Sequence, residues 1–361
     1  MGGALRVGVV GVGNISAQYF ATIPSLSALE LVAVADLDGE RASQVAAEQG
    51  VRSLSVDELL DDPEVDVVLN LTIPAAHVEV GLRALAAGKH VYAEKPFGLT
   101  TASATALLAA QVGGLRVGSA PDTVLGTGVQ TARRALDDEL IGDPVGASVH
   151  WSAAGHERWH PAPAFYYQPG GGPLFDMGPY YLTSLVTLFG PVIEVAGVAT
   201  RSSRERVVEQ GANAGQPVPV DVDTHISAIL VHANGVTSSV TVSFEVWATK
   251  APLFEVYGTA GTLELPDPNW FSETGSVWTT ADQEWRELPV TAGYELGGRG
   301  IGLADMAIAI AAGTPHRASG DLAFHVLEIM ESVLLASREH RVVTLGSTVT
   351  RPEAVDLKVA P

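Results

Sequence analysis

The sequence predicts an α/β fold class in two parts: a doubly wound parallel sheet, then an α+β part with a mostly antiparallel, open sheet. Three observations predict this arrangement. Strand-like and helix-like segments alternate along residues 1–121, as in the repeated βα units of a parallel sheet. Strand-like segments then follow one another within residues 122–361. A length of 361 residues also favours two domains over one.

The composition is that of a folded, acidic protein. Hydrophobic residues make up 47% of the chain and charged residues 17%, which suits sizeable cores. The net charge of −20 argues against nucleic acid and anionic membrane surfaces as partners, because both repel an acidic protein. The lack of cysteine excludes disulfides and thiolate nucleophiles. We find neither a signal-peptide pattern nor a long apolar segment, so we expect a cytoplasmic protein.

The first element is a compact apolar run over residues 5–10, which leads into Gly11-Val12-Gly13-Asn14-Ile15-Ser16. A helix-like stretch follows to about Ile23, and a second β-branched run over 31–35 ends at Asp36. A lone glycine turn would be weak evidence. The order of strand, glycine turn, helix, strand and acid is typical of a dinucleotide-binding unit, so we predict a Rossmann domain over residues 1–121.

Each part of this unit has a physical role. Gly11 permits the tight turn, and Gly13 lets the backbone approach a pyrophosphate. Asp36 can accept hydrogen bonds from a ribose hydroxyl and would repel a 2′-phosphate, which favours NAD. Arg41 could offset that repulsion, so NADP stays possible. The predicted cofactor-binding residues here are Gly11, Gly13, Asn14, Ile15 and Asp36.

The βα alternation continues with helices over 39–49 and 75–87 and strands over 65–69 and 91–93. Ligands of such sheets bind outside the carboxyl ends of the strands. Further cofactor-binding residues are therefore expected among those that follow the strands, namely Asn70, Thr72, Pro74, His77, Glu94 and Lys95. His77 lies in the first turn of its helix, where a capping or solvated role is favoured over catalysis.

Residues 122–361 read as an α+β domain for substrate binding and oligomerisation. A helix is predicted over 123–139, and turns at Asn234-Gly235 and Thr259-Ala260-Gly261 predict hairpins. The predicted strands are 145–151, 192–200, 225–232, 236–246 and 253–257. The helices expected to cover this sheet are 177–189, 301–312 and 322–338. Residues 201–216 are the segment that we expect to be most mobile.

The string His156-Glu157-Arg158-Trp159-His160 matches the HExxH pattern of zinc proteases. That chemistry requires both histidines on one face of a continuous helix. Pro161 follows directly and pushes His160 out of the α region, so we predict no metal site. Trp159 and His160 are instead predicted to line a substrate pocket, with an ordinary surface loop as the alternative.

A second segment with candidate functional residues runs from Gly170-Gly171-Gly172 through Asp176 to Tyr180. The glycines allow close backbone approach, and Asp176 is predicted to cap the following helix, with Tyr180 in its first turn. Lys95 is the only cation of residues 91–96. An ammonium near a phenol lowers the pKa of the phenol, which suits general acid/base catalysis.

With these motifs in place, the chain resembles the Gfo/Idh/MocA family of oxidoreductases over nearly its whole length. The resemblance is carried by the glycine loop, by Glu94-Lys95-Pro96, and by the glycine run that leads to Asp176-Met177-Gly178-Pro179-Tyr180. Many members have histidine where this chain has Tyr180, which is similar to the tyrosine branch that includes dimeric dihydrodiol dehydrogenase. Thr183 replaces an aspartate of many histidine-type members, which puts a His–Asp pairing in doubt.

The resemblance implies hydride transfer between a nicotinamide and a secondary alcohol or ketone of a sugar, cyclitol or related polyol. Tyr180 would be the general acid/base, Lys95 would lower the pKa of Tyr180 and donate to the developing alkoxide, and Asp176 would orient the lysine or the substrate. A homodimer or homotetramer is also implied. The alternatives are a glycosidase that uses bound NAD for transient oxidation, and a non-catalytic NAD-binding sensor.

Overall fold

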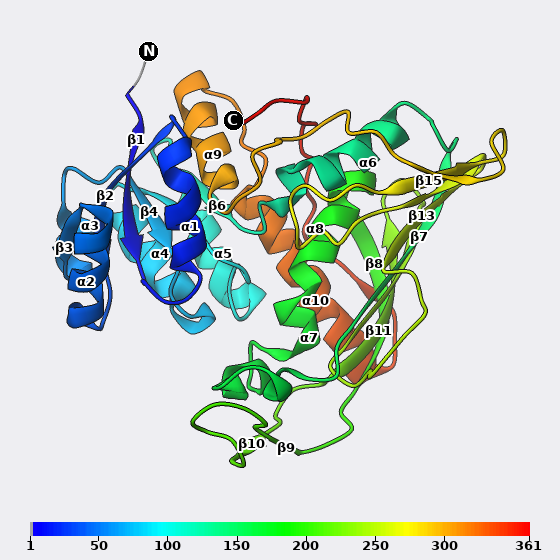
Figure 1. Cartoon of the computed structure of the whole chain (residues 1–361), viewed down its shortest axis with the longest axis horizontal. Helices are drawn as coiled ribbons and strands as arrows, with labels where there is room; N and C mark the ends of the chain where they lie inside the picture. Colours follow the sequence, from blue (N-terminus) through cyan, green and yellow to red (C-terminus); the bar gives the residue numbers. More distant parts are fainter. Residues whose placement is uncertain (1–2) are drawn as a thin grey trace.

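The computed structural model describes residues 3–361. Met1 and Gly2, at the start of the first predicted domain, lie outside the described residues. Two sheets dominate the structure (Figure 1): the N-terminal sheet with its helices on the left, and a larger sheet on the right. Within residues 3–361, no helix is both long enough and apolar enough to cross a lipid bilayer.

The N-terminal sheet has six strands in the order β3-β2-β1-β4-β5-β6, and all of its pairs are parallel. This is the doubly wound order, so the first half of the predicted fold is confirmed. Its strands are β1 (Leu5–Val10), β2 (Leu29–Ala35), β3 (Arg52–Leu54), β4 (Val67–Asn70), β5 (His90–Ala93) and β6 (Val117–Ser119). Its helices are α1 (Ser16–Thr22), α2 (Gly39–Gln49), α3 (Val56–Asp61), α4 (His77–Ala86) and α5 (Thr101–Ala109).

The larger sheet has nine strands in the order β16-β15-β14-β13-β7-β12-β11-β8-β17. Only the β7–β12 pair is parallel among the described strands of this sheet, which confirms a mostly antiparallel sheet. The strands are β7 (Pro144–Ser152), β8 (Val192–Thr200), β11 (His225–His232), β12 (Thr237–Ser243), β13 (Phe254–Gly258), β14 (Gly261–Glu264), β15 (Ser276–Thr279), β16 (Trp285–Glu287) and β17 (Val343–Thr344). The predicted hairpins at Asn234-Gly235 and Thr259-Ala260-Gly261 are both present.

The helices that cover one face of this sheet are α6 (Thr127–Asp137), α8 (Gly178–Phe189) and α10 (Gly320–Glu339). The helix α9 (Ile301–Ala312) was expected to join them, and that expectation is wrong. Its buried side chains pack with those of β1, α1 and α2 on the N-terminal sheet. A doubly wound sheet buries both of its faces. Helices α3, α4 and α5 cover one face, and α9 joins α1 and α2 to cover the other.

The helix predicted over residues 123–139 is interrupted. A short 3-10 turn, η3 (Thr123–Leu125), precedes α6, and Gly126 between them is extended. A Cβ at Gly126 would lie 2.2 Å from the carbonyl oxygen of Phe271. The close crossing of these two backbones, which are distant in sequence, therefore breaks the helix.

The segment 201–216 is mostly exposed but paired in part, and its expected mobility stays a prediction. It carries β9 (Glu205–Val207), which pairs with β10 (Pro217–Pro219) in a small hairpin. Val208 and Val218 are buried in a separate core with Tyr167 and Phe244. This core fixes the hairpin beside the loop of residues 153–171, which we call the aromatic loop.

Candidate active site

The glycine loop between β1 and α1 has the conformation that a dinucleotide requires. Gly11 has φ +95°, and a Cβ there would lie 2.8 Å from the backbone of Leu71, so only glycine fits. Gly13 and Asn14 are exposed, and open space surrounds the Cβ position of Gly13. Ile15 packs against the core beneath. A phosphate can therefore approach the loop backbone at Gly13.

Asp36 lies directly after β2 and ties this loop in place. Its Oδ2 accepts a hydrogen bond from the backbone N–H of Val12 at 2.8 Å, and its Oδ1 accepts from Arg41 Nη2 at 2.7 Å. Burial alone would raise the pKa of Asp36, but the N–H groups of Asp38 and Val12 together with Arg41 lower it. A charged carboxylate here fits a ribose hydroxyl, so the residues present fit a dinucleotide.

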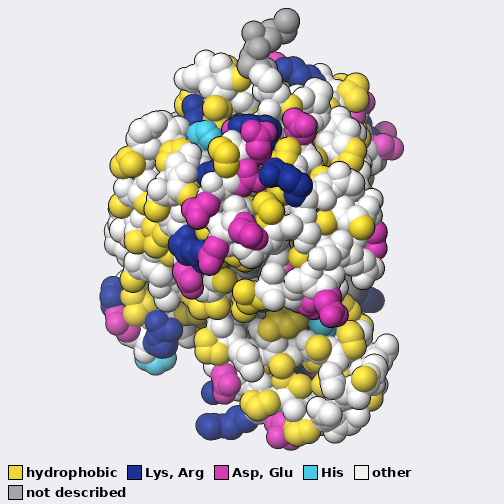
Figure 2. All heavy atoms as spheres, turned by 90° about the vertical axis from the view of Figure 1, so that its left-hand side faces the viewer, with side chains coloured by type: hydrophobic (Ala, Val, Ile, Leu, Met, Phe, Trp, Pro, Cys, Tyr) yellow, Lys and Arg dark blue, Asp and Glu magenta, His cyan; other side chains and the backbone are white. Residues whose placement is uncertain are grey.

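A cleft of about 680 Å³ adjoins the loop and is lined by Val12, Gly13 and Arg41 together with side chains of α1 and α2. Figure 2 shows the face that carries the N-terminal domain, where acidic and basic side chains are interspersed. On this face the charge of the protein does not form a patch of one sign.

Asn70 and His77 connect the strand ends. Asn70 is fully buried; its Oδ1 accepts from Thr72 Oγ1 at 2.6 Å, and its Nδ2 donates to the carbonyl of His77 at 3.0 Å. The ring nitrogens of His77 lie 3.0 Å from the carbonyl oxygen of Thr72 and 2.8 Å from that of Pro96.

The solvated or capping role expected for His77 is therefore wrong. The turn η2 (Pro74–Ala76) brings the chain over the sheet edge before α4 begins, which directs the His77 ring inward. Burial lowers the pKa of His77, although the two carbonyl groups oppose this effect. Asn70, Thr72 and His77 position the loops, and their contact with a cofactor stays a prediction.

Glu94 and Lys95 follow β5 at the same sheet edge. Glu94 is buried and accepts a hydrogen bond from the hydroxyl of Tyr19 at 2.7 Å. Lys95 Nζ donates to Asp176 Oδ1 at 2.9 Å and to the backbone carbonyl of Asp176 at 2.6 Å. The fold thus brings together two residues, one from each sheet region, that lie 81 positions apart.

Both members of this pair are charged at neutral pH. Burial alone would lower the pKa of Lys95, but Asp176, Tyr180 and Glu94 raise it overall. Burial alone would raise the pKa of Asp176, but Lys95 and His156 lower it to about 2. The site therefore holds a permanent ammonium at the junction of the two halves.

The predicted capping role of Asp176 is wrong. Asp176 ends the short helix α7 (Gly172–Asp176), and α8 begins at Gly178 with Met177 at its N-cap and no side-chain cap. The glycine run and Pro173 start a helix one turn earlier than expected. The carboxylate of Asp176 lies between Lys95 and His156 instead, and each of its two oxygens has one of these side chains as a hydrogen-bond partner.

Tyr180 lies in the first turn of α8 and is buried. Lys95 Nζ lies over its ring, 5.2 Å from the ring centroid. The hydroxyl accepts a hydrogen bond from Arg299 Nη2 at 2.9 Å. The structure therefore brings Lys95, Asp176 and Tyr180 together, as predicted, and adds Arg299. The only sequence signal for Arg299 is its position between Gly298 and Gly300, just before α9.

His156 is a second residue that sequence reasoning missed at this site. Its Nε2 lies 3.0 Å from Asp176 Oδ2, and its Nδ1 accepts from Trp159 Nε1 at 3.2 Å. Because the indole N–H can only donate, His156 Nδ1 is the acceptor and Nε2 carries the proton towards Asp176. His156 thus fixes the second oxygen of the carboxylate that binds Lys95.

The HExxH string does not form the helix that a zinc protease needs. His156–Arg158 is a 3-10 turn, and the His156 ring is directed to Asp176. Over residues 3–361, no cluster of three or more His, Asp or Glu side chains could hold a metal ion. Trp159 is 55% exposed, and His160 lies in edge-on contact with Trp159, Phe165 and Tyr166.

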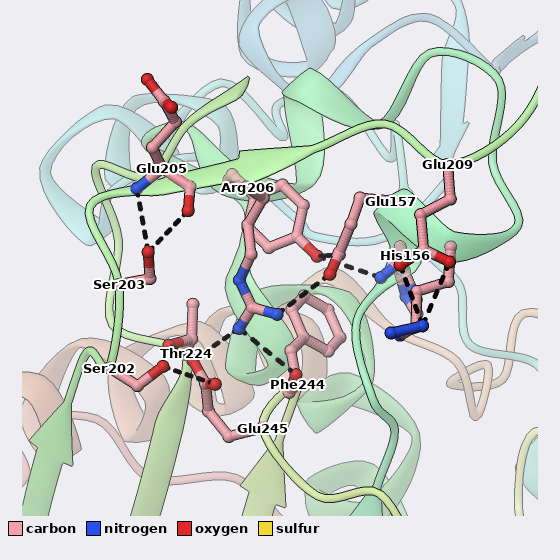
Figure 3. Close-up of polar contacts among 12 residues, drawn as sticks. His156, Glu157, Ser202, Ser203, Glu205, Arg206, Glu209, Thr224, Phe244 and Glu245 are labelled. Carbon is pink, nitrogen blue, oxygen red and sulfur yellow. Dashed lines mark hydrogen bonds and ion pairs between the residues drawn. The ribbon is translucent and has the colours of Figure 1, made fainter. Parts of the chain in front are cut away.

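A buried ionic network anchors the aromatic loop (Figure 3). Arg206 Nη1 donates to Glu157 Oε1 at 2.9 Å, and its Nη2 lies 2.7 Å from Glu245 Oε1. The hydroxyl of Tyr167 donates to the other oxygen of Glu157. Glu157 directly follows His156, so the network sets the position of the histidine that holds Asp176.

A dinucleotide-type glycine loop and, at the same sheet edge, a lysine paired with a carboxylate and lying over a tyrosine suit a nicotinamide-dependent oxidoreductase. Residues 5–113 match the oxidoreductase family with an NAD-binding Rossmann fold, and residues 129–264 match the GFO/IDH/MocA C-terminal domain. The chain is 30% identical over 274 residues to trans-1,2-dihydrobenzene-1,2-diol dehydrogenase of Sus scrofa, covering 74% of this chain and 76% of that protein. The chain belongs to the Gfo/Idh/MocA family of NAD-dependent oxidoreductases.

Other similar proteins agree with this assignment. Inositol 2-dehydrogenase 3 of Saccharopolyspora erythraea is 26% identical over 301 residues, covering 78% of this chain and 80% of that protein. A structure of levoglucosan dehydrogenase with NADH and levoglucosan superposes with a TM-score of 0.81 at 22% identity, covering 95% of this chain and all of that one. The latter likeness shows a shared fold. The predicted family, fold class and NAD cofactor are confirmed.

Proposed function

We propose that this protein oxidises a secondary alcohol of a cyclic polyol or sugar, or reduces the corresponding ketone, with Tyr180 as the general acid/base. The observation that carries this proposal is the position of Lys95, which hydrogen-bonds Asp176 and lies over the ring of Tyr180 at the carboxyl end of β5. This is the edge at which parallel sheets bind their ligands.

Alcohol oxidation removes a hydride from carbon and a proton from oxygen. The glycine loop and Asp36 would hold NAD, which would supply the hydride acceptor. Tyr180 takes the proton as a phenolate, whose oxygen also accepts from Arg299. In the reverse reduction, the phenol returns this proton to the substrate oxygen. The ammonium of Lys95 stabilises the negative charge that develops on that oxygen, and Asp176 orients the ammonium.

The aromatic loop supplies the proposed substrate pocket. Trp159 and Phe165 are exposed, and Tyr166 is half-buried beside them. The pKa of Tyr166 is raised to about 12 by burial and by Asp176, so its hydroxyl remains a hydrogen-bond donor. Aromatic faces with a few polar groups suit a ring that has an apolar face and several hydroxyls. The relatives named for dihydrobenzenediol, inositol and levoglucosan favour such a substrate.

The test is a panel of cyclitols, sugars and cyclic trans-diols incubated with NAD and, in parallel, with NADP, with formation of reduced nicotinamide followed by absorbance. Oxidation of at least one ring substrate, preferentially with NAD, is expected. Hydrolysis of glycosides without net NADH would favour the NAD-assisted glycosidase. Tight NADH binding with no turnover across the panel would favour the sensor.

A second copy of this chain is the proposed partner of the open face of the larger sheet. Val198 on β8, Ile229 on β11 and Val342 are exposed and line one shallow depression there with small side chains. The same depression is also lined by Ser227, Ser239, Thr241, His340 and Arg341. Exposed sheet faces that carry apolar side chains among polar ones pair with an identical face in symmetric dimers. We therefore propose a homodimer, or a homotetramer built from it, in the cytoplasm. Light scattering of Ile229→Lys against wild type tests the assembly.

A further inference from the structure

Arg299 is buried beside the proposed acid/base, and the proposed reaction gives it no role beyond its hydrogen bond to Tyr180. Its side chain is only 7% exposed. Its Nη2 donates to the Tyr180 hydroxyl at 2.9 Å and lies 3.4 Å from Asn269 Oδ1. Its Cζ lies 5.4 Å from the centroid of the Tyr180 ring. A guanidinium in this position favours the negative form of the phenol oxygen that it touches.

Arg299 is itself held by a buried acid. Its Nη1 lies 3.9 Å from Asp122 Oδ1, and Asp122 Oδ2 accepts from the backbone N–H groups of Gly300 and Gly302 at the start of α9. Among the described residues, Arg299 Nη1 and Asp122 Oδ1 have no hydrogen-bond partner. Asp122 thus restrains Arg299 by charge while leaving its Nη2 for Tyr180.

We infer that Arg299 is the positioning residue that stabilises the phenolate of Tyr180, and that the charge of Asp122 sets how strongly Arg299 does so. This inference rests on the proposed function, in which Tyr180 exchanges the proton. It divides the work between two cations. Arg299 hydrogen-bonds the tyrosine oxygen, while Lys95 lies over the ring and is assigned to the substrate oxygen.

Other ionisable groups surround Arg299 and Tyr180, and a variant used in a test must alter no more than one of these groups. Those that face Tyr180, besides Arg299, are Lys95 after β5 with its partner Asp176, Tyr166 in the aromatic loop, and Tyr181 on α8. Those that face Arg299, besides Tyr180, are Glu94, Asp122, Tyr19 and Tyr92. Burial alone would lower the pKa of Arg299, but Tyr180, Glu94 and Asp122 raise it overall, so the guanidinium is charged throughout.

The test titrates Tyr180 directly and needs no substrate. The full chain has eight tyrosines, so the tyrosinate absorbance of Tyr180 is obtained as the difference between each protein and the same protein with Tyr180→Phe. Arg299→Gln is expected to move the ionisation midpoint of Tyr180 up by about one pH unit or more. Arg299→Lys should recover much of the shift, and Asn269→Ala should leave the midpoint unchanged.

Arg299→Gln leaves Asp122 buried without its cation and can impair folding, so a second variant tests the same inference. Asp122→Asn keeps an oxygen for the N–H groups of α9 while removing the competing charge, and should move the Tyr180 midpoint down. Equal midpoints in wild type and Arg299→Gln, an upward shift in Asp122→Asn, or no ionisation of Tyr180 before unfolding in any of these proteins would overturn the inference.

The proposed function is tested separately. With any ring substrate that the panel identifies, the rise of kcat/KM for oxidation with pH should move in parallel with the absorbance midpoint. If the absorbance midpoint moves as expected but no panel compound is oxidised, the proposed function fails and the Arg299–Tyr180 coupling stands. If a compound is oxidised but the absorbance midpoint does not move, the proposed function stands and the Arg299–Tyr180 coupling fails.

Discussion

The cofactor half and the substrate half of this site are built in different ways. Around the glycine loop, side chains bind nearby backbone groups, as Asp36 binds Val12 N–H and Asn70 binds the carbonyl of His77. In the substrate half, side chains bind each other across the chain, as Lys95 binds Asp176. The cofactor half is set within the N-terminal domain, whereas the Lys95–Asp176 pair forms only when segments 81 positions apart have come together.

The largest effect on turnover is expected where the two halves meet. Lys95→Ala should reduce kcat by about 10²–10³-fold, because a preorganised donor to developing charge is worth roughly 2.7–4 kcal/mol. The affinity for NADH, measured by fluorescence titration, should change little. Lys95→Arg is the matched control, since it keeps the charge near Asp176 but not the position of the ammonium. Equal losses in turnover and NADH affinity would contradict a role confined to catalysis.

The next effect belongs to the substrate half alone. Arg206→Met leaves the buried Glu157 and the half-buried Glu245 without their shared cation. Unfolding should therefore require about 3 kcal/mol less free energy, as measured by urea denaturation. The protein that remains folded should show a raised KM for substrate. A displaced Glu157 also displaces His156, which holds Asp176 at the site.

The triple variant Arg206→Met, Glu157→Gln, Glu245→Gln is the matched control for this network. It removes the charges together and should recover most of the lost stability. Stability that stays low in the triple variant would show that packing of the arginine, rather than its charge, holds the loop.

The same contrast explains what sequence could predict. The glycine loop, Asp36 and the two hairpin turns are local patterns, and the structure reproduces them. Arg299 lies 119 positions from Tyr180 and His156 lies 20 from Asp176, and no local spacing reports such pairs. The errors on the helix over 123–139 and on α9 have the same cause, namely packing against a distant segment. The error on Asp176 is local, because the glycine run and Pro173 start a helix before it.

A smaller effect is expected from Asp36 in the cofactor half. Asp36→Asn keeps an acceptor for Val12 N–H but weakens a charge-assisted hydrogen bond to the ribose, worth about 1.5 kcal/mol. NADH should bind about tenfold more weakly, and NADPH should gain relative to NADH because Arg41 is released. In Asp36→Asn with Arg41→Ala, the relative gain for NADPH should disappear. Substrate KM at saturating NAD should not move, which separates this half from the other.

The smallest effect is the acid dependence of the Lys95–Asp176 pair. The pKa of Asp176 is lowered in the folded protein from its ordinary value of 3.8 to about 2, so the folded state favours the carboxylate. The stabilisation is complete well above pH 3.8 and is lost as the pH falls towards 2. Between pH 5 and pH 3 the pair should therefore lose about 1 kcal/mol of stability. Urea denaturation of Asp176→Asn should lack this component, while Glu284→Gln, which alters an exposed acid, should retain it. An identical acid dependence in wild type and Asp176→Asn would mean that the pair is not formed in solution.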